Sequence, residues 1–160
     1  MKDFYIGMRA VIQRVNKASV EIDQQIVGKI EKGVVIMLGV THEDTEEDAQ
    51  YLSQKITNMR IFEDSVGKMN LSLKEINGGA LTISQFTLYA NMRKGRRPSF
   101  IEAALPDKAN LLYEYFIECL KEEDIYVSQG VFGAMMYVRI DNYGPVTIIL
   151  NSDDRFKPRN

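Results

Sequence analysis

Short apolar runs at β-strand spacing recur along most of the chain. Over residues 8–15 the side chains divide between two faces, with Ala10 and Ile12 on one and Val11, Gln13 and Val15 on the other. Residues 33–40 are almost continuously apolar, which predicts a central strand covered on both faces. Further strands are predicted over residues 19–22, 26–30, 80–84, 125–129, 135–140 and 146–150. The chain should therefore be rich in β-structure.

Two segments instead carry apolar residues at helical spacing. The first covers residues 45–59, with Thr45 as the expected N-cap and Asp48 as its capping-box partner. The second covers residues 106–121, and Cys119 falls on its apolar stripe, which favours a core residue over a nucleophile. Together the elements predict an α+β protein, with one domain over residues 8–160 and an N-terminal extension of unknown role over residues 1–7. The polar tail, residues 151–160, is expected to fray.

A Gly-Pro step interrupts the last strand pattern, within the stretch Asn142-Tyr143-Gly144-Pro145-Val146-Thr147. Proline has no N–H for a sheet ladder and is confined to edges, bulges and strand starts. Turn statistics favour a hairpin turn with a proline start to the second strand. The alternative is a functional corner that turns two backbone carbonyls outward. Arg14 also interrupts an apolar strand, where it either faces solvent or anchors a polar group from a buried position.

Composition and net charge limit the number of domains, the cellular compartment and the extent of any nucleic-acid-binding surface. At 160 residues the chain is long enough for one self-sufficient core. A single cysteine excludes an intrachain disulfide, and with no recognisable signal peptide or membrane-length apolar run we expect a soluble, cytoplasmic protein. The net charge of −2 argues against a broad nucleic-acid-binding surface. Four cations nevertheless cluster at Arg93, Lys94, Arg96 and Arg97. The cluster is either a patch that binds phosphate groups or a solvated loop.

Conventional catalytic groups are scarce. The single histidine, His42, and the helical cysteine do not make a metal-ligand set, so neither a metal nor a cofactor is expected. His42 precedes the first helix and is predicted to be an exposed loop residue rather than the base of a triad. The sequence contains no Gly-rich phosphate loop.

The polar string Ser84-Gln85-Phe86-Thr87-Leu88-Tyr89-Ala90 resembles a signature of the D-aminoacyl-tRNA deacylases, also called D-tyrosyl-tRNA(Tyr) deacylases. The Gly-Pro stretch, residues 142–147, is similar to the second signature of that family. Other strings are similar to further family segments, namely Met8 to Val15, Lys94-Gly95-Arg96-Arg97-Pro98-Ser99-Phe100 and Gly130-Val131-Phe132-Gly133-Ala134-Met135-Met136. Two separate motifs in the same order make coincidence improbable.

The resemblance implies a β-rich, barrel-like homodimer with its active site at the interface and a cis Gly-Pro bond. Gly144 and Pro145 of one subunit would receive the substrate's ammonium group in the partner's pocket, with Arg14 holding the corner. Ser84, Gln85, Phe86 and Thr87 would form the catalytic wall, in which the N–H groups of Phe86 and Thr87 make an oxyanion hole. Phe132 and Met136 would line the substrate pocket, and Arg93, Lys94, Arg96 and Arg97 would bind tRNA.

The implied activity is hydrolysis of the ester of mischarged D-aminoacyl-tRNA, and of glycyl-tRNA, as chiral proofreading in translation. Thr87 has no evident base, whereas the tRNA brings a 2′-hydroxyl next to its ester, so RNA-assisted attack by water is favoured over a threonine nucleophile. The alternatives are an editing domain of the threonyl-tRNA synthetase type, a non-enzymatic nucleic-acid-binding dimer and a structural dimer. The Gly-Pro corner argues against the first, and the overall acidity against the second.

Overall fold

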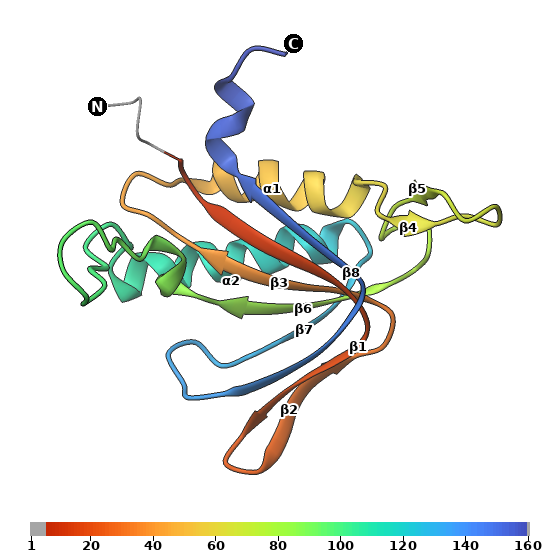
Figure 1. Ribbon diagram of the computed structural model, residues 1–160, viewed down its shortest axis with the longest axis horizontal. Helices are drawn as coiled ribbons and strands as arrows, with labels where there is room; N and C mark the ends of the chain where they lie inside the picture. The colour runs from red at the N-terminus through yellow and green to blue at the C-terminus, as the bar shows by residue number, and fades with distance from the viewer. Residues whose placement is uncertain (1–5, 160) are drawn as a thin grey trace.

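The computed structural model describes residues 6–159, which form a curled sheet with two helices (Figure 1). Its main strands are β1 (Arg9–Ile22), β2 (Gln25–Ile30), β3 (Gly33–Gly39), β6 (Gly79–Ser84), β7 (Tyr126–Gln129) and β8 (Tyr137–Asn151). A small hairpin pairs β4 (Phe62–Glu63) with β5 (Met69–Leu71). The helices are α1 (Glu46–Asn58) and α2 (Pro106–Glu122), accompanied by two 3-10 turns, η2 (Phe86–Tyr89) and η3 (Ser152–Phe156).

Strand β1 is the centre of the sheet. One edge of β1 pairs antiparallel first with β3 and then with β2, and the other edge pairs antiparallel with β8. Strands β6 and β7 continue the sheet from β3 in parallel. The Lys29 N–H on β2 donates to Ser128 Oγ on β7 at 2.9 Å, which brings the two ends of the sheet together. The predicted mixed, barrel-like α+β fold is thus confirmed as a nearly closed sheet.

The sheet buries apolar side chains on both faces. One cluster lies between the sheet and the two helices and includes Ile12, Ile36 and Phe116. The other lies on the opposite, concave face and includes Val20 and Leu81. Because β3 contributes to both clusters, its residues are apolar almost without interruption, as predicted.

Two sequence predictions about the strands need correction. Residues 8–15 and 19–22 belong to one long strand, β1, rather than to two. The predicted hairpin turn at residues 142–147 is wrong, because β8 runs through the Gly-Pro step as one strand. Gln13 pairs with Thr147 and Val15 pairs with Asn142, so four residues of β8 lie opposite Arg14 alone. The Gly-Pro corner is therefore a bulge that leaves the ladder and returns to it.

The helices match their predicted ranges to within one residue at each end. Thr45 is the N-cap of α1, and its N–H donates to the Asp48 carboxylate at 2.8 Å, which confirms the predicted capping box. Asp48 also accepts from Ser152 Oγ and from Arg155, each at 2.6 Å. These bonds hold η3 against α1, so the prediction that the tail frays is wrong for residues 152–156.

Of the predicted N-terminal extension, residues 1–7, the first five residues lie outside the described part of the chain. Its last two residues contact the domain, because the Asp153 N–H donates to Ile6 O at 3.2 Å and the Tyr89 hydroxyl donates to Gly7 O at 2.6 Å. Over residues 6–159, neither helix has the length and apolar composition needed to cross a membrane.

Candidate active site

The η2 turn directly follows β6 and is held by its own backbone and by buried neighbours. The Gln85 N–H donates to Leu38 O at 2.8 Å, which extends the parallel pairing of β3 and β6. The buried Tyr89 hydroxyl lies 2.6 Å from Gly7 O and 3.0 Å from Gly39 O. A Cβ on Gly39 would approach Tyr89 to 2.8 Å, so glycine is needed for the turn to pack this closely.

This turn presents backbone N–H groups at the end of the strand. The first N–H that bonds within the turn is that of Leu88, which donates to Gln85 O at 3.3 Å. The N–H groups of Phe86 and Thr87 precede it and have no carbonyl partner inside the turn. The side chains of both residues are exposed, and Gln85 Nε2 donates to Thr87 Oγ1. N–H groups left unpaired in the first turn of a helix can donate to an anionic oxygen.

The loop that follows β7 brings Phe132 and Met136 to the same end of the sheet. Because β6 and β7 are parallel, their carboxyl ends lie at one edge, and the Gly130 N–H donates to Thr82 O at 3.1 Å. A Cβ on Gly130 would lie 2.7 Å from the Met136 sulfur and 3.3 Å from Ile83, so Met136 reaches β6 next to Ser84. Met136 packs against the apolar cluster on the concave face, whereas Phe132 packs on the helix side, with its ring centre 6.3 Å from that of Tyr113. A shared role of the two residues in a substrate pocket stays a prediction.

The Gly-Pro corner is anchored by Arg14, which is almost fully buried. Arg14 Nε donates to Tyr143 O at 3.0 Å and Nη1 donates to Ile61 O at 2.8 Å. The guanidinium also lies 4.9 Å from the centre of the Tyr143 ring. Of the two interpretations of this strand arginine, the structure supports the buried anchor.

The corner itself projects from the sheet. Gly144 and Pro145 are exposed, and the peptide bond between them is cis, as the family resemblance implied. Gly144 has φ +127°, and a Cβ there would lie 2.8 Å from Arg14 Nη2, so only glycine fits. The Val146 N–H donates to Asn142 Oδ1 at 3.2 Å, which ties the two sides of the bulge together.

Within a single chain, the corner does not reach the η2 turn. Ser84 is level with Leu38 and Ala10, whereas the corner lies opposite Arg14, four residues further along β1. Strands β1 and β3 also separate β8 from β6. At ordinary strand spacing and residue rise, the two motifs lie about 15–20 Å apart in the sheet.

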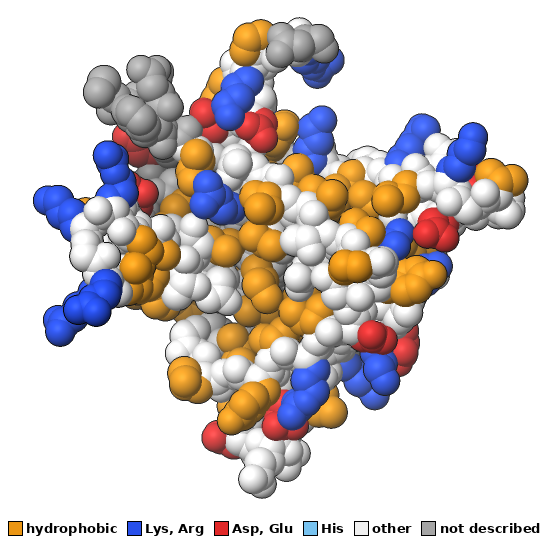
Figure 2. Space-filling model, viewed as in Figure 1, with side chains coloured by type: hydrophobic (Ala, Val, Ile, Leu, Met, Phe, Trp, Pro, Cys, Tyr) orange, Lys and Arg blue, Asp and Glu red, His pale blue; other side chains and the backbone are white. Residues whose placement is uncertain are grey.

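The four predicted RNA-binding cations lie on the loop after η2. Arg93, Lys94, Arg96 and Arg97 are all exposed. No carboxylate in the described part of the chain forms an ion pair with any of them. Lys and Arg side chains project from this edge of the molecule in Figure 2, where Figure 1 places the loop.

Other candidate groups do not form a site. His42 is exposed, as predicted, and its Nε2 lies 2.6 Å from Ile101 O, which can only accept a hydrogen bond. Cys119 is buried in α2, and burial raises the pKa of its thiol, consistent with the predicted core role. Over residues 6–159 no group of His, Cys, Asp and Glu residues could hold a metal ion.

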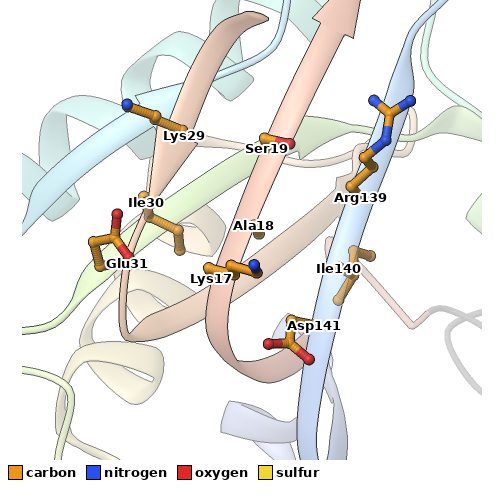
Figure 3. Close-up of a pocket in the computed structure, with 9 residues that line it drawn as sticks. All are labelled: Lys17, Ala18, Ser19, Lys29, Ile30, Glu31, Arg139, Ile140 and Asp141. Atoms are coloured by element: carbon orange, nitrogen blue, oxygen red, sulfur yellow. The ribbon is translucent and has the colours of Figure 1, made fainter.

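A cavity of about 490 Å³ lies over β1, β2 and β8 (Figure 3). Its basic side chains, Lys17, Lys29 and Arg139, come from three different strands and alternate with Glu31 and Asp141. Arg139 is also paired with Glu21 at 3.2 Å. None of the predicted site residues lines this cavity.

Sequence reasoning missed the residues that position the two motifs. Tyr89 and Arg9 hold the η2 turn, since Arg9 Nη1 donates to Leu88 O at 3.1 Å while Arg9 Nε donates to Asn151 at 2.9 Å. Asn142 closes the bulge. Both Tyr89 and Asn142 lie inside the two signature strings, and that position is the only sequence signal that could have indicated them.

Comparison with known proteins decides the family. A family model described as D-Tyr-tRNA(Tyr) deacylase matches residues 11–151. The chain belongs to the D-aminoacyl-tRNA deacylase family. It is 54% identical over 147 residues to the D-aminoacyl-tRNA deacylase of Bacillus pumilus, covering 92% of this chain and all of that one. It is 57% identical over 152 residues to that of Dehalococcoides mccartyi, covering 95% and 99%. The predicted enzyme class, a D-aminoacyl-tRNA deacylase and hence a hydrolase, is confirmed.

Solved structures of this deacylase-like fold agree. The c-Myc DNA Unwinding Element Binding Protein superposes with a TM-score of 0.83 at 38% identity, covering 89% of this chain and 97% of that one. A probable eukaryotic D-amino acid tRNA deacylase superposes with a TM-score of 0.79 at 18% identity, covering 90% and 98%. The second likeness concerns the fold alone.

Proposed function

We propose that this deacylase acts as a homodimer that hydrolyses the ester of D-aminoacyl-tRNA and of glycyl-tRNA, and spares L-aminoacyl-tRNA. The observation that carries the proposal is the separation of its two motifs. An exposed corner, stiffly anchored by Arg14, lies about 15–20 Å from the Phe86 and Thr87 N–H groups in the same chain. A second copy would supply the corner that each η2 turn lacks.

Exposed apolar surface supports association of two copies. Met135, Tyr137 and Ile149 are 93%, 70% and 61% exposed, although they are large and apolar. In Figure 2 apolar side chains gather over a hollowed part of the face on which β1 and β8 run. Large apolar side chains left exposed in this way are typical of protein interfaces.

In the proposed complex, Gly144 and Pro145 of one subunit enter the pocket beside η2 of its partner. Their carbonyl oxygens accept hydrogen bonds from the substrate's α-ammonium group. Backbone atoms then occupy the space that an L side chain needs, so selection works by exclusion. A D side chain points elsewhere and glycine has none, which is why both esters are accepted.

Hydrolysis then needs little from protein side chains. The 2′-hydroxyl of the terminal adenosine lies next to the ester and assists the attacking water, so the RNA supplies proximity. The N–H groups of Phe86 and Thr87 stabilise the oxyanion, and one such donor is typically worth about 2.7–4 kcal/mol. The Thr87 hydroxyl accepts from the Gln85 amide, bonds to no basic group within residues 6–159, and remains a spectator.

The test compares D-aminoacyl, L-aminoacyl and glycyl esters of one tRNA. We expect rapid hydrolysis of the D ester, slower hydrolysis of the glycyl ester and almost none of the L ester. Comparable turnover of the L ester would contradict exclusion at the corner. Analytical ultracentrifugation provides the second measurement, and an active monomer would contradict the shared site.

A further inference from the structure

The loop of basic residues encloses a cavity rather than a flat patch. The cavity has a volume of about 460 Å³, within the range of roughly 300–1,000 Å³ that is usual for ligand sites. It is lined by Asn91, Arg93, Lys94, Arg97, Ser99 and Ile101. Three of the four loop cations line it, and Arg96 does not. Among residues 6–159, no carboxylate belongs to the lining.

The backbone of the loop holds this cavity open. Asn91 and Ser99 exchange two backbone hydrogen bonds of 2.8 and 2.9 Å, which close the loop at its base. The Arg93 N–H donates to Asn91 Oδ1 at 2.9 Å, and Gly95 makes the tip of the loop at φ +66°. The three lining cations are therefore held on a closed loop, which lowers the entropic cost of binding an anion between them.

The cavity lies beside a second one that borders the η2 turn. A second cavity of about 320 Å³ shares Asn91 and Arg93 with the first and is lined on its other side by Leu88 and Tyr89 of η2. The Phe86 ring also packs edge-on against Phe100, with 5.1 Å between ring centres, so the two ends of the loop lie together beside the turn. If the aminoacyl ester of a tRNA lies at the Phe86 and Thr87 N–H groups, the nucleotides that precede the terminal adenosine would reach the cations within a few nucleotides.

We infer that this cavity binds backbone phosphate groups of the single-stranded 3′ end of tRNA, on the nucleotides that precede the terminal adenosine. The inference rests on the proposed function. Guanidinium and ammonium groups without a carboxylate partner are the groups that recognise phosphate oxygens. On a chain whose net charge is −2, binding of RNA depends on such a local cluster. Arg93, Lys94 and Arg97 make the contacts. Arg96, which the sequence prediction grouped with them, does not line the cavity, so we remove it from the tRNA-binding set.

The experiment compares Arg97→Gln with Arg96→Gln, which remove the same charge from the same loop. Each variant is assayed on D-aminoacyl-tRNA and on the D-aminoacyl ester of adenosine, which has no preceding phosphate. We expect Arg97→Gln to raise KM for the tRNA about tenfold, as for loss of a hydrogen bond to a charged group, and to leave turnover of the adenosine ester unchanged. The slope of log KM against log salt should fall by about 0.7–1. Arg96→Gln should behave as the wild type in both assays.

Two results would overturn the inference. Equal losses in Arg96→Gln and Arg97→Gln would show a diffuse basic surface instead of a cavity. If Arg97→Gln also lowered turnover of the adenosine ester, Arg97 would have a structural role in the η2 turn instead. If the wild-type enzyme hydrolysed neither ester, the proposed function would fail, and retention of labelled tRNA on a filter by the two variants would still decide whether the cavity binds RNA.

Discussion

The Gly-Pro corner and the η2 turn both offer backbone atoms to a substrate, but the chain holds them in different ways. The corner is a bulge in β8 whose main anchor is one buried guanidinium, that of Arg14. The turn continues a parallel strand pair and is held by Tyr89 and Arg9 as well as by its own backbone. The corner is therefore held to the rest of the protein mainly by Arg14, with Asn142 closing the bulge locally, whereas the turn has several independent supports.

This contrast predicts that the two regions respond differently to side-chain and backbone substitutions. In the turn, the functional atoms are N–H groups, so side-chain changes should matter little and changes to the backbone should matter greatly. At the corner, removal of one distant side chain or addition of one methyl group should be enough to move the carbonyl oxygens. A misplacement of about 1 Å in an active site can cost about 100-fold in rate.

The largest effect is expected from Thr87→Pro, which deletes a backbone N–H group that has no carbonyl partner inside the η2 turn. We expect kcat to fall by about 10²–10³, as for loss of one oxyanion donor. Thr87→Ala keeps the N–H, and as an exposed change we expect it to alter kcat by less than about threefold. Single-turnover hydrolysis of a D-aminoacyl-tRNA measures both. An inactive but folded Thr87→Ala would restore a threonine nucleophile and reverse the assignment of roles.

The corner is tested most sharply by Gly144→Ala. The new Cβ would lie 2.8 Å from Arg14 Nη2 and 2.9 Å from Val146, at φ +127°. We expect kcat/KM for the D ester to fall about 100-fold. Gly67→Ala is the matched control, because Gly67 also has a positive φ, of +81°, but a methyl group added there would meet nothing within 4 Å among residues 6–159 beyond its chain neighbours. Similar losses in the two variants would mean that the effect is general backbone strain.

The third test compares the two anchoring arginines. Arg14→Gln removes the donors to Tyr143 O and Ile61 O, so we expect about a tenfold lower kcat/KM for the D ester and a smaller ratio of D to L turnover. Arg9→Gln removes the donor to Leu88 O, but Tyr89 still holds the turn, so the expected change is below about threefold. The ratio of D to L hydrolysis is the deciding measurement, and an unchanged ratio in Arg14→Gln would mean that the corner does not depend on its anchor.

Much of this fold is predictable from local pattern. The capping box at Thr45, the continuous apolar run of β3 and the stripe that buries Cys119 each follow from residue types at fixed spacing. The signature strings also identified the turn and the corner as candidate sites. Met136 lies near Ile83, at the end of β6 where residues 84–87 begin, while the joint role of these residues and Phe132 in one pocket stays a prediction.

The predictions that were wrong concern features that depend on contacts between distant segments of the chain. A Gly-Pro step is typical of a hairpin turn, and nothing local shows that Arg14 lies beneath it and that β1 continues to pair on both sides. The tail, residues 152–156, is polar by composition, yet it is ordered by Asp48, more than 100 residues away. Hydrogen bonds between such distant residues leave no periodic trace in the sequence, so pattern reasoning could not find them.

The smallest effect on turnover is expected at the latch formed by Asp48 and η3, which supports the turn only indirectly. Ser152 Oγ donates to Asp48 and accepts from the Met8 N–H, next to the Gly7 carbonyl that holds Tyr89. Asp48→Asn should therefore leave kcat for the D ester within about threefold and lower the free energy of unfolding by about 1–3 kcal/mol.

The pH dependence of stability separates this latch from the catalytic regions. Burial alone would raise the pKa of Asp48, but hydrogen bonds from Ser152, Arg155 and Thr45 outweigh it and hold the pKa below its ordinary value. A carboxyl whose pKa is lower in the folded state stabilises the fold above its unfolded pKa, and that contribution is lost as pH falls through the folded pKa. Urea unfolding from pH 7 to pH 3 should thus show a steeper acid loss in the wild type than in Asp48→Asn. If the two curves of stability against pH were parallel, Asp48 would not be the group that ties η3 to α1, and the latch would not support the η2 turn through it.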